Sequence, residues 1–99
     1  MAAILMKAGD LKKGDMNAVK VNDREILLVN ADGRVYGYEN LCTHGGCRLQ
    51  HGTLSGGRIT CPCHGSVFDA TTGAVLDGPA TSPQPAIPVI VKDGGIYLA

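Results

Sequence analysis

Short apolar runs separated by turn residues make up most of this chain, and no apolar repeat is sustained over three helical turns. This pattern predicts an all-β fold. The expected strands cover residues 2–7, 18–21, 25–29, 35–38, 58–60, 67–69, 74–76, 87–91 and 96–98. Hairpin turns are expected at residues 30–33, 69–73 and 93–95, where glycine and aspartate adopt the backbone angles that tight turns require.

A glycine-rich segment from about residue 40 to 68 interrupts the strand pattern. We interpret it as a small subdomain inserted into the β base of a single domain that spans residues 1–99. Within it, Gly52, Gly56 and Gly57 are expected to mark ordinary turns. Four prolines between residues 79 and 88 predict an extended return toward the last pair of strands.

Charge and composition limit the kinds of partner and the cellular location that the protein can be expected to have. The 99 residues include nine basic and nine acidic side chains, with a formal charge of zero and no run of either sign. Nucleic acids and anionic membrane surfaces are therefore poor candidate partners. With one phenylalanine and no tryptophan the core is modest, so a metal site or a disulfide would help to stabilise it. The apolar patch within residues 1–7 is too short for a signal peptide or a membrane span, which predicts a cytoplasmic protein.

Two short segments, residues 42–47 and 61–66, contain all four cysteines and two of the three histidines. They offer two thiolates and two imidazoles from Cys42, His44, Cys61 and His64. This donor set suits a [2Fe-2S] centre in which histidines replace two cysteines on one iron, with the cysteines on the inner iron and the histidines on the outer one. It also suits a tetrahedral zinc site, although a single residue between Cys42 and His44 is tight spacing for two ligands of one metal.

The sequences Cys-Thr-His-Gly-Gly-Cys at 42–47, Cys-Pro-Cys-His-Gly-Ser at 61–66 and Gly-Pro-Ala at 78–80 resemble the motifs of Rieske proteins, closest to the soluble Rieske-type ferredoxins. The resemblance implies the Rieske fold, which has an antiparallel β-sandwich base and an inserted cluster-binding subdomain. It implies one [2Fe-2S] cluster per chain, with the ligands Cys42, His44, Cys61 and His64. It also implies that residues 78–80, with Pro79 at their centre, form the proline loop that covers the cluster.

The remaining two cysteines match a feature of the cytochrome bc type of Rieske protein. Two cysteines at the positions of Cys47 and Cys63 are bridged there, so we expect a Cys47–Cys63 disulfide that ties the two ligand loops together. Stable disulfides are rare in reducing cytosol, so this bond requires either burial beside the cluster or a hyperthermophilic host. The alternatives are two free buried cysteines or a thiol redox sensor.

Several neighbouring residues match positions that tune the cluster in this family. Gly45, Gly46 and Gly65 are expected to bring backbone N–H groups close to the inorganic sulfides. Ser66 is expected to reach a bridging sulfide, the alternative being a turn serine that caps local amides. Phe68 stands where high-potential relatives have a tyrosine whose hydroxyl binds a ligand sulfur. This combination predicts a reduction potential between the extremes of the Rieske range, about −150 to +300 mV.

The resemblance implies a one-electron carrier, and no phosphate loop, nucleophile elbow or second metal motif indicates an enzyme. We expect a monomeric ferredoxin that passes electrons from a reductase to a terminal oxidoreductase such as an oxygenase. Because the ligand imidazoles keep an ionisable N–H, electron uptake at His44 and His64 is expected to be coupled to proton uptake. A small Rieske subunit of a nitrite reductase or arsenite oxidase is the alternative within the family, and a zinc-stabilised binding module is the alternative outside it.

Overall fold

Ten strands and two single-turn 3-10 helices make up the computed structural model, which describes residues 4–99. The strands are β1 (Ile4–Lys7), β2 (Met16–Val21), β3 (Arg24–Ala31), β4 (Arg34–Glu39), β5 (Thr53–Ser55), β6 (Arg58–Thr60), β7 (Val67–Asp69), β8 (Val75–Asp77), β9 (Val89–Lys92) and β10 (Gly95–Leu98). The 3-10 helices are η1 (Ala8–Asp10) and η2 (Leu49–His51). The predicted all-β class is confirmed. No helix within residues 4–99 is long and apolar enough to cross a membrane.

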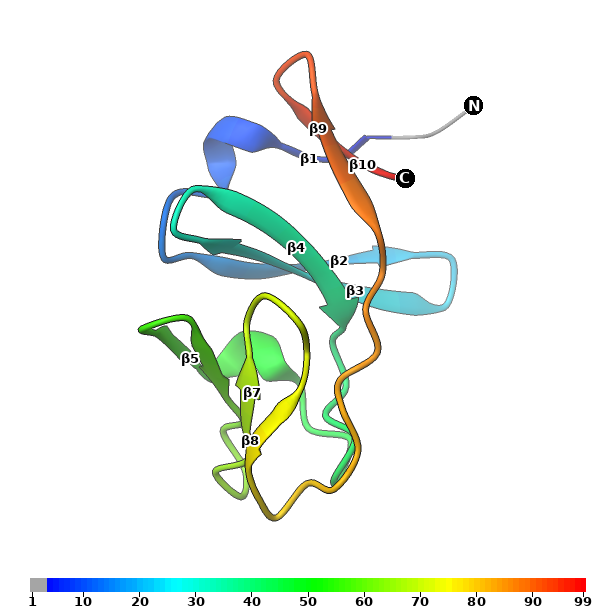
Figure 1. Ribbon diagram of the computed structural model, residues 1–99. Coiled ribbons are helices and arrows are strands. Elements are labelled where there is room, and N and C mark those ends of the chain that lie inside the picture. Colours follow the sequence, from blue (N-terminus) through cyan, green and yellow to red (C-terminus); the bar gives the residue numbers. More distant parts are fainter. Residues whose placement is uncertain (1–3) are drawn as a thin grey trace.

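The strands form three antiparallel sheets, with the orders β1-β10-β9, β2-β3-β4 and β5-β6-β7-β8. Figure 1 shows the β2-β3-β4 sheet between the other two, with the loops of the β5–β8 sheet at the far end of the molecule from the chain termini. The first two sheets form the predicted β base. The third sheet extends to Asp77, past the limit of about residue 68 expected for the inserted segment.

Strand β3 separates the two hydrophobic cores of the protein. Successive side chains of a strand point to opposite faces of its sheet. Leu27 and Val29 therefore pack into the core shared with the β5–β8 sheet, whereas Ile26 and Leu28 pack into the core shared with β10. All four side chains are fully buried. Burial on both faces explains why this strand is a continuous apolar run in the sequence instead of an alternating one.

The strands of the structure differ from the predicted ones where the pattern of apolar and polar side chains carries little information about strand position. The sequence pattern does not predict strand β5, because Leu54 is its only apolar residue. Backbone pairing with β6 holds this strand in place. The strand predicted at residues 87–91 begins at Val89, because Pro88 has no N–H to donate to a neighbouring strand. The predicted strand residues 2 and 3 lie outside the described part of the chain.

Gly52 has a more demanding role than the ordinary turn expected from the sequence. It ends η2, and a Cβ atom at this position would collide with the backbone oxygen of Thr60 on β6. Only glycine therefore allows the chain to pass this close to the strand that leads into the second Cys–His segment. Gly56 and Gly57 do form the β5–β6 turn as predicted, with φ angles of +59° and +75°.

Candidate functional site

The two Cys–His segments form loops with the same backbone hydrogen bonds. In the first loop, Gly46 donates its N–H to the Cys42 carbonyl at 2.9 Å, and Cys42 donates to the Cys47 carbonyl at 2.8 Å. In the second, Gly65 donates to the Cys61 carbonyl at 3.2 Å and Cys61 donates to the Ser66 carbonyl at 2.8 Å. The fifth residue of each loop is a glycine in the left-handed region, with φ of +73° at Gly46 and +76° at Gly65. Gly45 does not share this conformation.

The first residue of each loop supplies a buried thiol. Cys42 and Cys61 are both free and only 3% exposed. Burial raises the pKa of the Cys42 thiol, and the hydrogen bond with the neighbouring Cys61 thiol raises it further, while the backbone N–H groups of His44 and Gly45 act in the opposite direction. Metal ligation would displace the proton of a thiol at this position.

The two histidines lie together on the outer side of the loops. His44 and His64 are both exposed, and their ring centroids are 4.9 Å apart with an angle of 85° between the ring planes. Gly45 lies next to His64, and a Cβ atom on Gly45 would lie 3.8 Å from the imidazole, an ordinary contact distance. The structure thus places the four predicted ligand residues as a buried pair of thiols and an exposed pair of imidazoles.

A disulfide between Cys47 and Cys63 joins the two loops, with a Cα–Cα distance of 6.4 Å. The expected bond is therefore present in the structure. Cys47 is half-buried and Cys63 is exposed. The bond fixes the last residue of the first loop to the middle of the second.

Ser66, Phe68 and Pro79, which are expected to tune a cluster, differ in burial and in contacts. Ser66 is fully buried, and its hydroxyl oxygen accepts the N–H of Ala80 at 3.0 Å, which fixes residues 78–80 against the second loop. Phe68 is also fully buried, in the core that contains both free cysteines. Pro79 is exposed within the segment that Ser66 holds.

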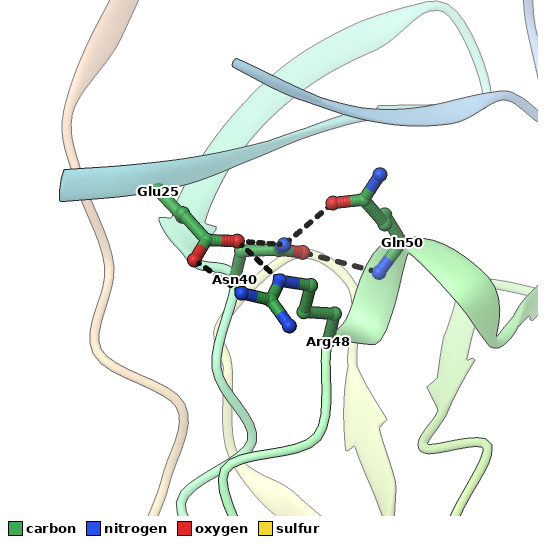
Figure 2. Close-up of polar contacts among 4 residues, drawn as sticks. All are labelled: Glu25, Asn40, Arg48 and Gln50. Carbon is green, nitrogen blue, oxygen red and sulfur yellow. Dashed lines mark hydrogen bonds and ion pairs between the residues drawn. The ribbon is translucent and has the colours of Figure 1, made fainter. Parts of the chain in front are cut away.

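A polar network that the sequence analysis missed holds the base of the first loop (Figure 2). The guanidinium of Arg48 donates to both carboxylate oxygens of Glu25, at 2.8 and 3.1 Å. The amide nitrogen of Asn40 donates to Glu25 at 3.2 Å and to the Gln50 side chain at 2.7 Å, while the Asn40 oxygen accepts the Gln50 backbone N–H at 3.1 Å. Asn40 is fully buried, so the loop is fastened to β3 on both of its flanks.

The hydrogen bond from Arg48 is the main reason that the pKa of Glu25 lies below its usual value, with a smaller contribution from Asn40. The same contact raises the pKa of Arg48. No periodicity or spacing in the sequence connects residue 25 with residues 40 to 50. An asparagine two positions before Cys42 is the only local signal. Its burial and its partners depend on the tertiary fold.

A family model, a related sequence and solved structures all match this chain over most of its length. Residues 2–90 match the family model described as the Rieske [2Fe-2S] domain. The chain is 40% identical over 89 residues to the ferredoxin component of the naphthalene 1,2-dioxygenase/salicylate 5-hydroxylase systems of a Ralstonia species, which covers 90% of this chain and 86% of the relative. The structure is similar to a ferredoxin of Sphingomonas yanoikuyae B1, with a TM-score of 0.92, 34% identity and coverage of 99% and 97%. It is also similar to a chain from a complex of reduced oxygenase and oxidized ferredoxin in carbazole 1,9a-dioxygenase, with a TM-score of 0.91, 33% identity and coverage of 99% and 92%.

Proposed function

Because this chain belongs to the Rieske [2Fe-2S] domain family, we propose that it is the ferredoxin of an oxygenase system, which carries single electrons from a reductase to a terminal oxygenase. The match covers nearly the whole chain, and the chain covers most of the ferredoxin relative. The observation that carries the proposal is the pairing of two buried free thiols with two exposed imidazoles on adjoining loops.

The side chains present fit a Rieske-type [2Fe-2S] cluster. Such a centre needs two cysteine sulfurs on one iron and two histidine nitrogens on the other. We assign the thiols of Cys42 and Cys61 to the first iron and the imidazoles of His44 and His64 to the second. When bound, the cluster would supply reversible one-electron chemistry. The remaining residues of the site hold the two loops, cover the cysteines and leave the histidine edges open.

The arrangement of the donors favours two metals over a single zinc ion. Within residues 4–99, no three Cys, His, Asp or Glu side chains converge to hold one ion. A structural zinc site gathers all four of its ligands around a single centre. Two thiols on the buried side and two imidazoles on the exposed side instead match a centre with two irons, each held by two side chains.

The exposed histidines give an electron a short route to a partner. The relatives are ferredoxin components, and one similar chain comes from a complex with an oxygenase, which supports protein partners on both sides of the transfer. Such a protein is an electron carrier and not itself an enzyme. We also propose that it works as a monomer in the cytoplasm, a location with which its ferredoxin relatives are consistent. The coupling of electron and proton uptake stays a prediction.

A stopped-flow experiment tests this function directly. The protein is reduced anaerobically with a stoichiometric reductant and mixed with the oxidised oxygenase of a naphthalene dioxygenase system, and its visible absorbance is followed. We expect one electron to be taken up per chain and passed on to the oxygenase. The Ralstonia ferredoxin component serves as the positive control. If this protein takes up no electron, the proposal is wrong. If the Ralstonia ferredoxin transfers its electron and this protein takes one up but transfers none, a naphthalene dioxygenase is not its acceptor.

A further inference from the structure

The segment between β8 and β9 (Val89–Lys92) runs as a strap along β4 and toward the first ligand loop. Ile87 donates its N–H to the Gly37 carbonyl at 2.8 Å, and Glu39 donates its N–H to the Pro85 carbonyl at 2.9 Å. These bonds continue the pairing of β4 (Arg34–Glu39) with an extended segment. Figure 1 shows this segment passing from the end of β8 at the loop end of the molecule up to β9. Backbone pairing with β4 stops at Glu39, where β4 ends.

Beyond Glu39, the side chain of Gln84 makes the hydrogen bonds between the strap and the chain that leads into the first loop. Its amide nitrogen donates to the carbonyl oxygens of Glu39 and Leu41, at 2.5 and 2.7 Å. Its amide oxygen accepts the N–H of Thr43 at 3.2 Å. These partners fix the orientation of the amide, because two carbonyls must face the NH₂ group and an N–H must face the oxygen. Gln84 is 2% exposed, and no buried side-chain N or O atom within residues 4–99 lacks a partner.

These contacts bracket the first proposed ligand. Leu41 and Thr43 are the two neighbours of Cys42, and Thr43 separates Cys42 from His44. Gln84 therefore holds the peptide group on each side of Cys42 in a fixed orientation. The Thr43 hydroxyl adds a bond to the Ser82 carbonyl at 2.9 Å, which fixes the same residue to the strap a second time. The Glu25–Arg48 network holds the first loop from the β3 side. The strap holds the same loop through Gln84 and Ser82.

We propose that Gln84 is a positioning residue that fixes Cys42 and His44 in the geometry that cluster binding requires. A glutamine is needed because it presents two donors and one acceptor at the end of a side chain long enough to reach three backbone groups. Methionine has a similar volume and none of these groups. Glutamate keeps the acceptor and loses the NH₂ donors. The inference rests on the proposed function, since it takes Cys42 and His44 as ligands.

The test compares Gln84→Met with Tyr38→Phe as the matched control. Tyr38 donates its hydroxyl to the Ala70 carbonyl at 2.9 Å, which is also a buried hydrogen bond to backbone but one that touches neither ligand loop. Both variants are purified anaerobically with the cluster bound. Three quantities are measured: the midpoint of thermal unfolding, the rate at which a chelator removes the visible absorbance, and the midpoint reduction potential.

We expect both variants to unfold at a lower temperature than the wild type. Only Gln84→Met should lose its cluster faster. The increase should be about 10- to 100-fold, which is the loss of metal affinity typical when a residue that orients metal ligands is removed. Its reduction potential should also shift, whereas the potential and the chelator rate of Tyr38→Phe should match the wild type. If Gln84→Met yields no folded protein, Gln84→Asn decides by the same measurements, because its shorter side chain keeps the amide donors and acceptor but cannot reach all three backbone partners.

A Gln84 variant that unfolds at a lower temperature, but has the chelator rate and potential of the control, would show a purely structural role and overturn the inference. That result leaves the proposed function intact. In contrast, a wild-type protein that binds no iron–sulfur cluster would overturn the proposed function itself. The two failures are therefore distinguishable.

Discussion

Removing the Cys47–Cys63 disulfide should lower the stability of the protein by a calculable amount. The perturbation is the double variant Cys47→Ala with Cys63→Ala, which leaves no unpaired thiol at the site. The two cysteines are 16 residues apart in the sequence. In the chain-entropy model a crosslink that closes a loop of this size contributes about 3 kcal/mol to the free energy of unfolding. For a domain of this length, 1 kcal/mol corresponds to roughly 4–8 °C, so the midpoint of unfolding should fall by roughly 12–24 °C.

The assay is anaerobic thermal unfolding followed by circular dichroism, with visible absorbance recorded on the same sample. The wild type with its disulfide selectively reduced is the matched control, because it loses the crosslink without any change of sequence. We expect this control and the double variant to unfold within a few degrees of each other. Because the bond joins the two ligand loops, the visible absorbance should be lost at the same lower temperature as the secondary structure.

A fall of less than about 4 °C would contradict this reasoning. It would mean that the crosslink removes much less conformational entropy from the unfolded chain than the chain-entropy model gives. A large fall in the variant with no change in the reduced wild type would also contradict it, since the effect would then come from the substituted side chains.

Three further outcomes are expected. Because the hydrogen bond from Arg48 lowers the pKa of Glu25, the wild type should be more stable than Glu25→Gln at neutral pH, and urea unfolding should show this advantage disappear as the pH falls below 4.5. Potentiometric titration should give a higher midpoint for Phe68→Tyr, whose hydroxyl can donate to a ligand sulfur, and a lower midpoint for Ser66→Ala. Gly52→Ala should unfold at a markedly lower temperature, because its Cβ atom would overlap a backbone oxygen of β6.

For each of these three predictions, a specific result would contradict the reasoning. A stability difference between wild type and Glu25→Gln that stays constant down to pH 3 would show that the carboxylate is not stabilised by the folded state. Unchanged potentials in both cluster-tuning variants would place Ser66 and Phe68 outside the influence of the cluster. For Gly52→Ala, the matched control is Gly45→Ala, because a Cβ atom at position 45 meets its neighbours at ordinary contact distances. Equal effects of the two substitutions would contradict the steric argument.

The sequence predicted those parts of the fold that local chemistry determines. The apolar run of β3 and the turns at residues 30–33 and 93–95 could be identified because buried strands and left-handed turn residues have strong local signatures. Strands β6 (Arg58–Thr60) and β7 (Val67–Asp69) have the predicted ends. Strand β5 could not be identified in this way, since it is held by pairing with β6 and has little apolar pattern of its own.

The candidate site also has a part that the sequence predicts and a part that it does not. The spacing of the cysteines and histidines identified the four proposed ligands, because two metals held by two loops require side chains close together in sequence. The contacts of Gln84 and Glu25 with the first loop could not be predicted, because they join residues more than twenty positions apart along the chain. Their partners are selected by how the strap and β3 pack around the loop, and no local pattern encodes that packing.

The central claim is that Cys42 and Cys61 hold one iron and His44 and His64 hold the other. The most direct test is a Mössbauer spectrum of the protein isolated with ⁵⁷Fe, combined with iron and inorganic sulfide analysis. We predict two irons and two sulfides per chain, and two iron sites of equal population in different environments, one with sulfur ligands only and one with nitrogen ligands. Two equivalent iron sites, or a colourless protein that contains zinc and no sulfide after anaerobic purification, would contradict the claim.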